Sequence, residues 1–325
     1  MEQNQQQNIG RRHFLKNTLA GSAALSFASF PAFSLDDNQM PYSVLGKTGI
    51  KISRVGLGGW QLGTPEIRQD TVNTIVNKAI DNGITLIDTA PNYGDSEERL
   101  GIAIEGRRKN LVLATKTEEQ TYDGTWKLLE QSLERMKTDY IDIIYIHSLG
   151  NQERFTDIPL LVSKKGGLQA LLDAKEQGIL KAVGVSGHNY PSLFHKALDT
   201  NQIDVMMNAV NFVSQHIYNF EDKIWSRASQ QNLGLVAMKV LGGSNEDGIR
   251  IPKEHFKAAI RYALFATPAH GAVIGMDKPE QVDELVAVAK DLHQMDEKEQ
   301  FDYYKLGLTL SEEPRWKFPY GPPAT

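Results

Sequence analysis

Eight short runs of β-branched and aliphatic residues recur along the chain after Tyr42, and each is followed by a segment long enough for a helix. The runs occupy residues 54–59, 85–90, 111–116, 141–147, 182–186, 205–211, 235–240 and 272–275. Regular alternation of strands and helices is typical of parallel strands joined by helical crossovers. Eight such units in about 290 residues fit a TIM barrel, usually about 250 residues long, better than two separate domains. We therefore expect a (β/α)8 TIM barrel.

The segments between the runs have helical periodicity. Amphipathic patterns predict helices over 69–81, 125–136, 167–177 and 279–292. We find no Pro/Gly/Ser-rich linker and no break in composition, so we expect one domain over 35–325. Residues 43–53 form two short β-rich pieces around a glycine-containing turn. This pattern predicts a hairpin that caps the bottom of the barrel, away from the chemistry.

The N-terminal 34 residues differ from the rest. Arg11 and Arg12 are followed by Phe-Leu-Lys and then by a weakly apolar run of 15 residues, 19–33. This order resembles a twin-arginine export signal. The run is shorter than the about 20 apolar residues of a membrane span. The resemblance implies a signal peptide over 1–34, use of the twin-arginine export machinery and a periplasmic protein; an ordinary amphipathic helix or an uncleaved anchor are the alternatives.

Charge and cysteine content exclude several kinds of site. The chain has 35 Lys and Arg against 40 Asp and Glu, a formal net charge of -5. A nucleic-acid surface needs clustered cations, so we expect no nucleic-acid partner. With no cysteine, the chain lacks disulfides, thiolate zinc sites, iron–sulfur ligation and a cysteine nucleophile. The histidines have no ligand spacing, and we predict no metal.

Chemically useful side chains stand at the ends of the predicted strands. In a TIM barrel the carboxyl ends of all strands meet at one rim. The residues at those ends, with Tyr93 in the loop after the second strand, are Asp88, Lys116, His147, Ser186, Asn208, Met238, Lys239 and Gly275. The pattern predicts that an acid, a phenol, an amine and an imidazole converge there as an active site.

Several of these positions lie in a recognisable pattern. Residues 87–101, IDTAPNYGDSEERLG, resemble the signature of the aldo-keto reductase family, and Ala-Thr-Lys at 114–116, Tyr-Ile-His at 145–147 and Gly-Val-Ser at 184–186 follow in the family's order. The resemblance implies reduction of a small aldehyde or ketone, or the reverse oxidation, with a nicotinamide cofactor. It also implies Tyr93 as general acid, Lys116 stabilising its phenolate, Asp88 neutralising the lysine, and His147 binding the substrate oxygen.

The same resemblance implies where the cofactor binds. The carboxamide would lie near Ser186 and Asn208, the ring on Met238, and a phosphate near Lys239. Around the adenosine 2'-phosphate, the positions of the family's Lys and Arg are occupied by Gly275 and Gln281. Lys278 is the nearby cation, and Glu284 would contact the adenine. NADP(H) is expected ahead of NAD(H) as the family's preference.

The substrate pocket is less well defined by the sequence. Trp60, after the first strand, is the residue expected to line it. Two other functions stay open. Lys116 could form a Schiff base in a lyase or aldolase of the same fold, or the barrel could bind a nicotinamide without catalysis, as a sensor.

Overall fold

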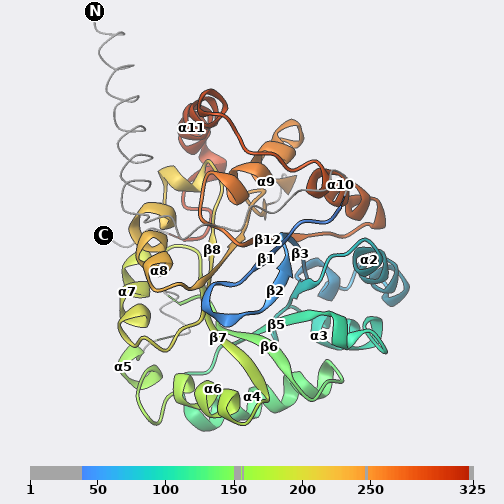
Figure 1. The fold of residues 1–325 in the computed structure, drawn as a ribbon, viewed down its shortest axis with the longest axis vertical. Helices are drawn as coiled ribbons and strands as arrows, with labels where there is room; N and C mark the ends of the chain where they lie inside the picture. The colour runs from blue at the N-terminus through green and yellow to red at the C-terminus, as the bar shows by residue number, and fades with distance from the viewer. Residues whose placement is uncertain (1–38, 150–154, 156, 246–247, 322–325) are drawn as a thin grey trace, which may run out of the picture.

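The computed structural model describes residues 39–149, 155, 157–245 and 248–321. The predicted export signal lies outside these residues. Eight parallel strands close into a barrel in the order β12-β3-β4-β5-β6-β7-β8-β9 (Figure 1). They are β3 (Val55–Gly58), β4 (Leu86–Asp88), β5 (Val112–Thr117), β6 (Ile141–Ile146), β7 (Leu180–Gly187), β8 (Val205–Ala209), β9 (Gly234–Met238) and β12 (Gly271–Gly275). Each predicted run supplies one strand, and the predicted TIM barrel is confirmed.

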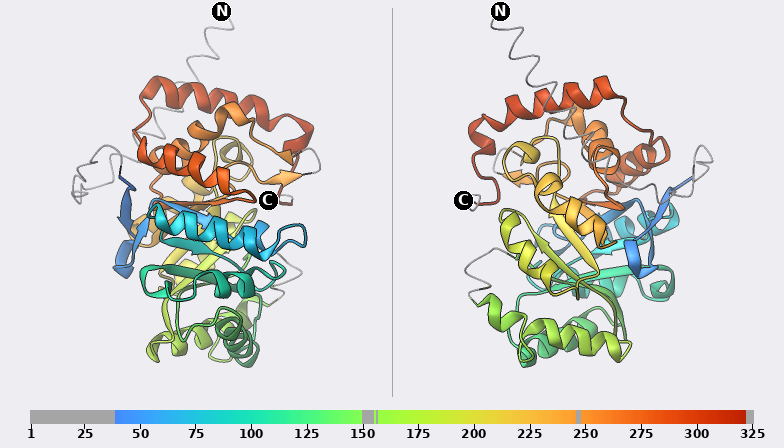
Figure 2. Two further views of the ribbon diagram at one scale, coloured as in Figure 1. Left: turned by 90° about the vertical axis from the view of Figure 1, so that its right-hand side faces the viewer. Right: turned by 60° about the vertical axis from the view of Figure 1, so that its left-hand side comes forward.

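Helices surround the barrel (Figures 1 and 2). They are α2 (Gln69–Asp81), α3 (Ser96–Ala103), α4 (Tyr122–Arg135), α5 (Ile158–Leu161), α6 (Gly167–Glu176), α7 (Pro191–Asp199), α8 (Ser226–Gln230), α9 (Phe256–Phe265), α10 (Pro279–Lys290) and α11 (Glu297–Ser311). The four helices predicted from periodicity correspond to α2, α4, α6 and α10. In the described part of the chain, we find no helix with the length and apolar character needed to cross a membrane.

The core has two layers because side chains alternate along each strand. On β5, Leu113 packs in the large cluster between the barrel and the helices. Its neighbours Val112 and Ala114 instead belong to a smaller cluster inside the barrel. The same alternation holds on β6, where Ile143 and Tyr145 face inward. Alternation along each strand therefore also determines which side chains near its carboxyl end point into the barrel.

A hairpin closes the lower end of the barrel, as predicted. Strand β1 (Tyr42–Val44) pairs antiparallel with β2 (Lys51–Ser53), and Figure 1 shows the hairpin lying across the barrel. Leu45 is fully buried in the inner cluster. Gly46 has φ +47°, and a Cβ there would lie 2.3 Å from the Asn232 carbonyl oxygen. Glycine is therefore required for this close approach.

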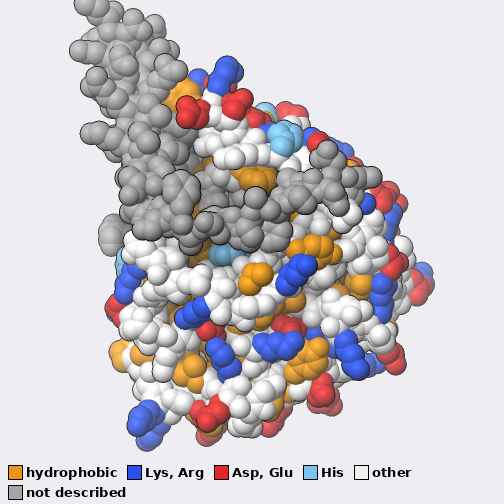
Figure 3. Space-filling view, viewed as in Figure 1, with side chains coloured by type: hydrophobic (Ala, Val, Ile, Leu, Met, Phe, Trp, Pro, Cys, Tyr) orange, Lys and Arg blue, Asp and Glu red, His pale blue; other side chains and the backbone are white. Residues whose placement is uncertain are grey.

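The surface at the hairpin end carries charges of both signs. Figure 3 shows Lys and Arg side chains interspersed with Asp and Glu side chains on this face. This distribution agrees with the nearly balanced charge of the chain, 35 cations against 40 anions.

Candidate active site

Strand alternation carries two charged side chains to the top of the barrel core. Lys116 lies two residues beyond Ala114 on the inward row of β5, and Asp88 lies two residues beyond Leu86 on the inward row of β4. The strands are paired in parallel, with Asp88 opposite Ala114. Apolar inward residues therefore give way to a polar layer at the carboxyl ends.

Lys116 and Asp88 form a buried ion pair. Lys116 Nζ lies 2.7 Å from Asp88 Oδ2 and donates to the Thr89 carbonyl oxygen at 2.6 Å. The two side chains are 1% and 6% exposed. Burial alone disfavours the ammonium, but the charges and hydrogen bonds of Asp88 and Tyr93 outweigh it, so the Lys116 pKa lies above its ordinary value. Lys116 is therefore a fixed cation.

Tyr93 lies above this cation in the loop between β4 and α3. Its ring centroid is 4.7 Å from Lys116 Nζ. The loop rests directly on the segment after β3, because a Cβ on Gly63 would lie 1.6 Å from the Tyr93 carbonyl oxygen. Gly94 has φ +54° and faces the Gly63 carbonyl. Two glycines thus allow the backbone contact that positions the phenol.

His147 and Trp60 both contact the ring of Tyr93. His147 follows β6, is 4% exposed and makes an edge-on ring contact with Tyr93 at 5.9 Å between centroids. Trp60 contacts Tyr93 edge-on at 5.0 Å and is 53% exposed. The structure therefore brings the four predicted catalytic residues together, with the predicted substrate residue at the open side.

Three of the predicted cofactor residues also lie on inward rows. Ser186 is fully buried on β7, and its Oγ accepts a hydrogen bond from the Ser148 N–H at 3.3 Å. Met238 belongs to the inner cluster. At Gly275, a Cβ would lie 2.1 Å from Gln61 Oε1, a buried oxygen with no hydrogen-bond partner. This unsatisfied acceptor marks a polar position at the rim.

Asn208 is not brought to the inner face. On β8, Val205 and Met207 face into the barrel and Met206 faces the helices. Asn208, two residues beyond Met206, therefore also faces the helices. Its Nδ2 donates to the Gly187 carbonyl oxygen at 3.2 Å, and its Oδ1 accepts from Trp225 Nε1 at 2.8 Å. The amide therefore links β8 to β7 and to the π-helical turn Glu221–Trp225.

Positive charge gathers after β9. Lys239 has φ +54°, and burial lowers its pKa, as do the charges of Arg250 and Lys116. Arg250 follows the small hairpin β10 (Ser244–Asn245) and β11 (Gly248–Ile249) and donates to the carbonyl oxygens of Gly242 and Arg315, each at 3.1 Å. Lys239 is thus repelled by two neighbouring cations, and this arrangement favours an anionic group at this part of the rim.

The first turn of α10 is arranged differently from the expected phosphate site. Gln281 Oε1 accepts from the backbone N–H groups of Asp277 at 2.8 Å and Lys278 at 3.1 Å. Gln281 therefore caps its own helix and occupies two of the amides that an anion would use. Lys278 is exposed. Glu284 forms an ion pair with Lys253, with 3.7 Å between Glu284 Oε1 and Lys253 Nζ.

Two further residues, Glu118 and Tyr320, contact residues of the rim. Glu118 Oε1 lies 3.0 Å from His147 Nδ1; it stands two residues beyond Lys116, so extension of the same inward row would have indicated it. Tyr320, from the C-terminal tail, packs on Tyr218 at 5.6 Å and on His188 at 5.5 Å between ring centroids. No local pattern indicates that tail contact, because it joins segments about 100 residues apart.

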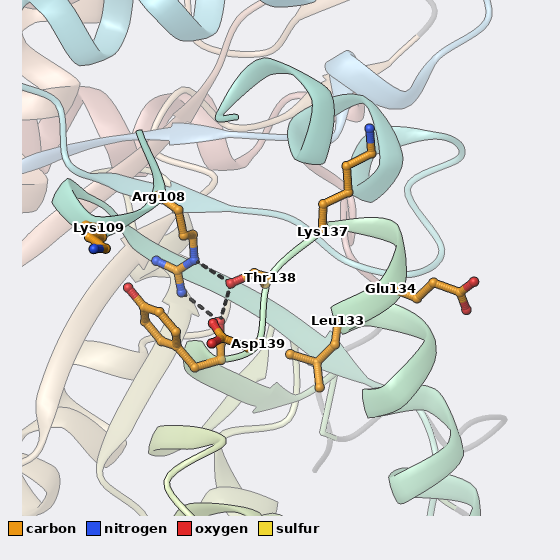
Figure 4. Close-up of a pocket in the computed structure, with 8 residues that line it drawn as sticks. Arg108, Lys109, Leu133, Glu134, Lys137, Thr138 and Asp139 are labelled. Atoms are coloured by element: carbon orange, nitrogen blue, oxygen red, sulfur yellow. Dashed lines mark hydrogen bonds between the residues drawn. The ribbon is translucent and has the colours of Figure 1, made fainter. Parts of the chain in front are cut away.

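A separate hollow lies at the opposite end of the barrel. It measures about 610 Å³ and is lined by residues that precede β5 and β6 (Figure 4). Its Arg108 donates to Thr138 Oγ1 at 3.0 Å and pairs with Asp142 at 2.8 Å. Through these bonds Arg108 holds neighbouring segments of the barrel together, which is a structural role. We therefore place the candidate active site at the rim.

Comparison with known proteins agrees with this placement. A model of the Aldo/keto reductase family matches residues 54–250. Aldo-keto reductase YhdN of Bacillus subtilis is 36% identical over 167 residues, which cover 45% of this chain and 47% of that protein. The chain spans about half the length of such curated relatives.

Solved structures match over more of the chain. A putative aldo-keto reductase from Pseudomonas aeruginosa superimposes with a TM-score of 0.65 at 28% identity, covering 79% of this chain and 98% of that one. An aldo/keto reductase from Klebsiella pneumoniae, in complex with NADP and acetate, gives a TM-score of 0.65 at 23% identity over 86% of this chain and 95% of that one. The second likeness shows a shared fold.

Proposed function

The chain belongs to the aldo/keto reductase family, and from this premise we propose that it reduces the carbonyl group of a small aldehyde or ketone, or catalyses the reverse oxidation, with a nicotinamide dinucleotide. One observation carries the proposal. The Lys116 ammonium, paired with Asp88 at 2.7 Å, lies 4.7 Å from the centre of the Tyr93 ring, and the His147 ring contacts the same ring at 5.9 Å between centroids.

This geometry suits proton donation to a carbonyl oxygen. When bound, the nicotinamide supplies the hydride that reaches the carbonyl carbon. Tyr93 Oη gives its proton to the oxygen, and the Lys116 ammonium stabilises the resulting phenolate. Asp88 keeps that ammonium protonated in a buried position. His147 orients the carbonyl by a hydrogen bond, and Trp60 lines the substrate side.

The residues present fit a nicotinamide dinucleotide. Ser186 and the Met238 thioether lie on inward rows beside the catalytic cluster, and the buried Gln61 Oε1 is an acceptor without a partner. Lys239 and Arg250 provide the positive charge that phosphates require. We assign the adenosine end to the region of Gly275 and Lys278. Because Lys278 is a cation there while Gln281 is neutral, the preference for NADP(H) over NAD(H) depends on Lys278.

Fluorescence titration of the purified chain with NADPH and NADH tests this assignment. We expect both to bind, NADPH the more tightly, with the difference reduced in Lys278→Gln. Removing one exposed phosphate contact should cost about tenfold in affinity or less. Lys290→Gln, at the far end of α10, is the matched control. Binding of neither nucleotide to the folded chain would reject a nicotinamide enzyme.

The Schiff-base alternative is disfavoured by the same ion pair. An amine must lose its proton before it attacks a carbonyl. The raised pKa of Lys116 keeps the proton in place. Borohydride should therefore leave Lys116 unlabelled in the presence of a carbonyl substrate.

We further propose that the chain is exported to the periplasm by the twin-arginine route. The proposal rests on Arg11, Arg12 and the apolar run after them, and a cofactor-binding barrel suits a route that carries folded proteins. Replacing both arginines by lysine should move the protein from the periplasmic to the cytoplasmic fraction. Equal periplasmic amounts of the variant and the natural chain would contradict it.

A further inference from the structure

A carboxylate that the reduction scheme does not use lies against the imidazole of His147. Glu118 Oε1 is 3.0 Å from His147 Nδ1, and the two side chains are 29% and 5% exposed, respectively. Glu118 comes from the segment after β5, whereas His147 follows β6. Parallel pairing of Thr117 with Ile146 brings the two segments side by side.

The contact determines where the ring carries its proton. An ionised carboxylate only accepts hydrogen bonds, so Nδ1 must donate. A neutral imidazole has one N–H group, and with that hydrogen on Nδ1 the other nitrogen, Nε2, has a lone pair. A lone pair cannot donate to a carbonyl oxygen. Nε2 becomes a donor only when the ring takes up a second proton.

The charges around His147 are arranged to support that second proton. Glu118 contacts the ring from the segment after β5, and Tyr93 contacts it from the loop after β4. The buried cation Lys116 lies 4.7 Å from the centre of the Tyr93 ring and is paired with Asp88 at 2.7 Å. Glu118 is thus the acid in direct contact with the imidazole, and a neighbouring carboxylate favours an imidazolium.

We propose that Glu118 is a positioning residue that holds a proton on His147 Nδ1, so that His147 binds the substrate carbonyl in its doubly protonated form. The step to the carbonyl rests on the proposed reductase function. The hydrogen-bond arrangement of the Glu118–His147 pair does not, because it is a property of the protein alone. The two parts are therefore tested separately.

The first test reads the tautomer directly, without substrate or cofactor. In protein with ¹⁵N-labelled histidine, the His147 ring signals are assigned by their loss in His147→Gln. At a pH where the ring is neutral, we expect the hydrogen on Nδ1 in the natural chain and in Glu118→Asp. Glu118→Gln should shift it toward Nε2, because the neutral amide can donate to Nδ1 as well as accept from it and therefore no longer fixes the hydrogen on Nδ1. A natural chain with the hydrogen on Nε2, or an unchanged ratio in Glu118→Gln, would overturn the proposal.

The second test uses the pH dependence of carbonyl reduction. In the natural chain kcat/KM should fall at high pH with the imidazolium fraction, by about tenfold or more over the alkaline limb. In Glu118→Gln the neutral ring with hydrogen on Nε2 can donate, so the part of this fall that follows the imidazole should shrink to about threefold or less, and only the fall at higher pH from loss of the Tyr93 proton should remain. Glu118→Asp should restore the fall. A merely structural role for Glu118 would lower kcat/KM equally at all pH values and would refute the assignment.

Glu119→Gln is the matched control. It removes the same charge from the next residue, which is exposed, and should leave both the tautomer and the pH profile as in the natural chain. If the chain reduces no carbonyl compound at all, the proposed function fails while the ¹⁵N measurement still decides the Glu118–His147 arrangement. If reduction occurs but the tautomer is on Nε2, only the positioning role fails.

Discussion

Tyr93→Phe should lose carbonyl reduction by about 10³-fold or more in kcat/KM while nicotinamide binding is unchanged. The variant keeps the ring that contacts Trp60 and His147 and removes only the hydroxyl, the proton donor above Lys116. A positioned general acid typically contributes about 10²- to 10⁴-fold. The measurement combines initial rates of aldehyde reduction with NADPH titration of the same preparation.

Tyr140→Phe is the control for this variant. Tyr140 also lies next to cations, with Arg108 and Lys181 at 4.0 and 4.6 Å from its ring centre, but it is at the opposite end of the barrel. Its loss of the hydroxyl should leave the rate unchanged. A Tyr93→Phe enzyme with more than about a tenth of the natural rate would show that Tyr93 is not the general acid.

Lys116→Met should abolish reduction and also destabilise the fold by about 3 to 5 kcal/mol. The variant leaves the Asp88 carboxylate buried without its cation, and one half of a broken buried pair has this cost. Burial raises the pKa of Asp88, an effect that Lys116 opposes in the natural chain. Without Lys116, folded Asp88 binds a proton that the unfolded chain releases. The stability of Lys116→Met should therefore rise as pH falls from neutral toward 5.

Urea unfolding of the single and double variants measures this effect. Lys116→Met with Asp88→Asn removes both charges, so it should recover much of the lost stability at neutral pH without recovering activity. Lys109→Met, at an exposed position beside the distant hollow, should change neither property. Equal unfolding midpoints for Lys116→Met and the natural chain would show that the buried pair does not contribute to stability.

The clustering of Asp88, Tyr93, Lys116 and His147 was predictable because it depends on strand ends. Eight alternating units indicate a barrel, and in a barrel every strand ends at the same rim. Asp88, Lys116 and His147, which lie at strand ends, are therefore expected to lie close together. Tyr93 follows from its position in the loop after β4. The structure places all four together, although their catalytic roles remain for the proposed experiments.

The cofactor residues were less predictable because a resemblance in sequence does not specify side-chain direction. Asn208 and Met238 were both assigned from strand ends, yet Asn208 lies on an outer row and bonds to Gly187 and Trp225. Gln281 bonds to the backbone of its own helix turn. In each case the hydrogen-bond partners of the side chain depend on its direction in the folded chain, which the resemblance does not give.

By itself, the sequence determined the eight barrel strands and their order, four of the helices between them, the hairpin before them and the residues at the strand ends. These features depend on local periodicity and on the parallel arrangement that closes a barrel. The tertiary structure decided which side of each strand end faces inward, which carboxylate contacts His147 and where the tail residue Tyr320 packs. Those contacts join segments that are distant in the chain, and their geometry depends on the closed barrel rather than on any local pattern.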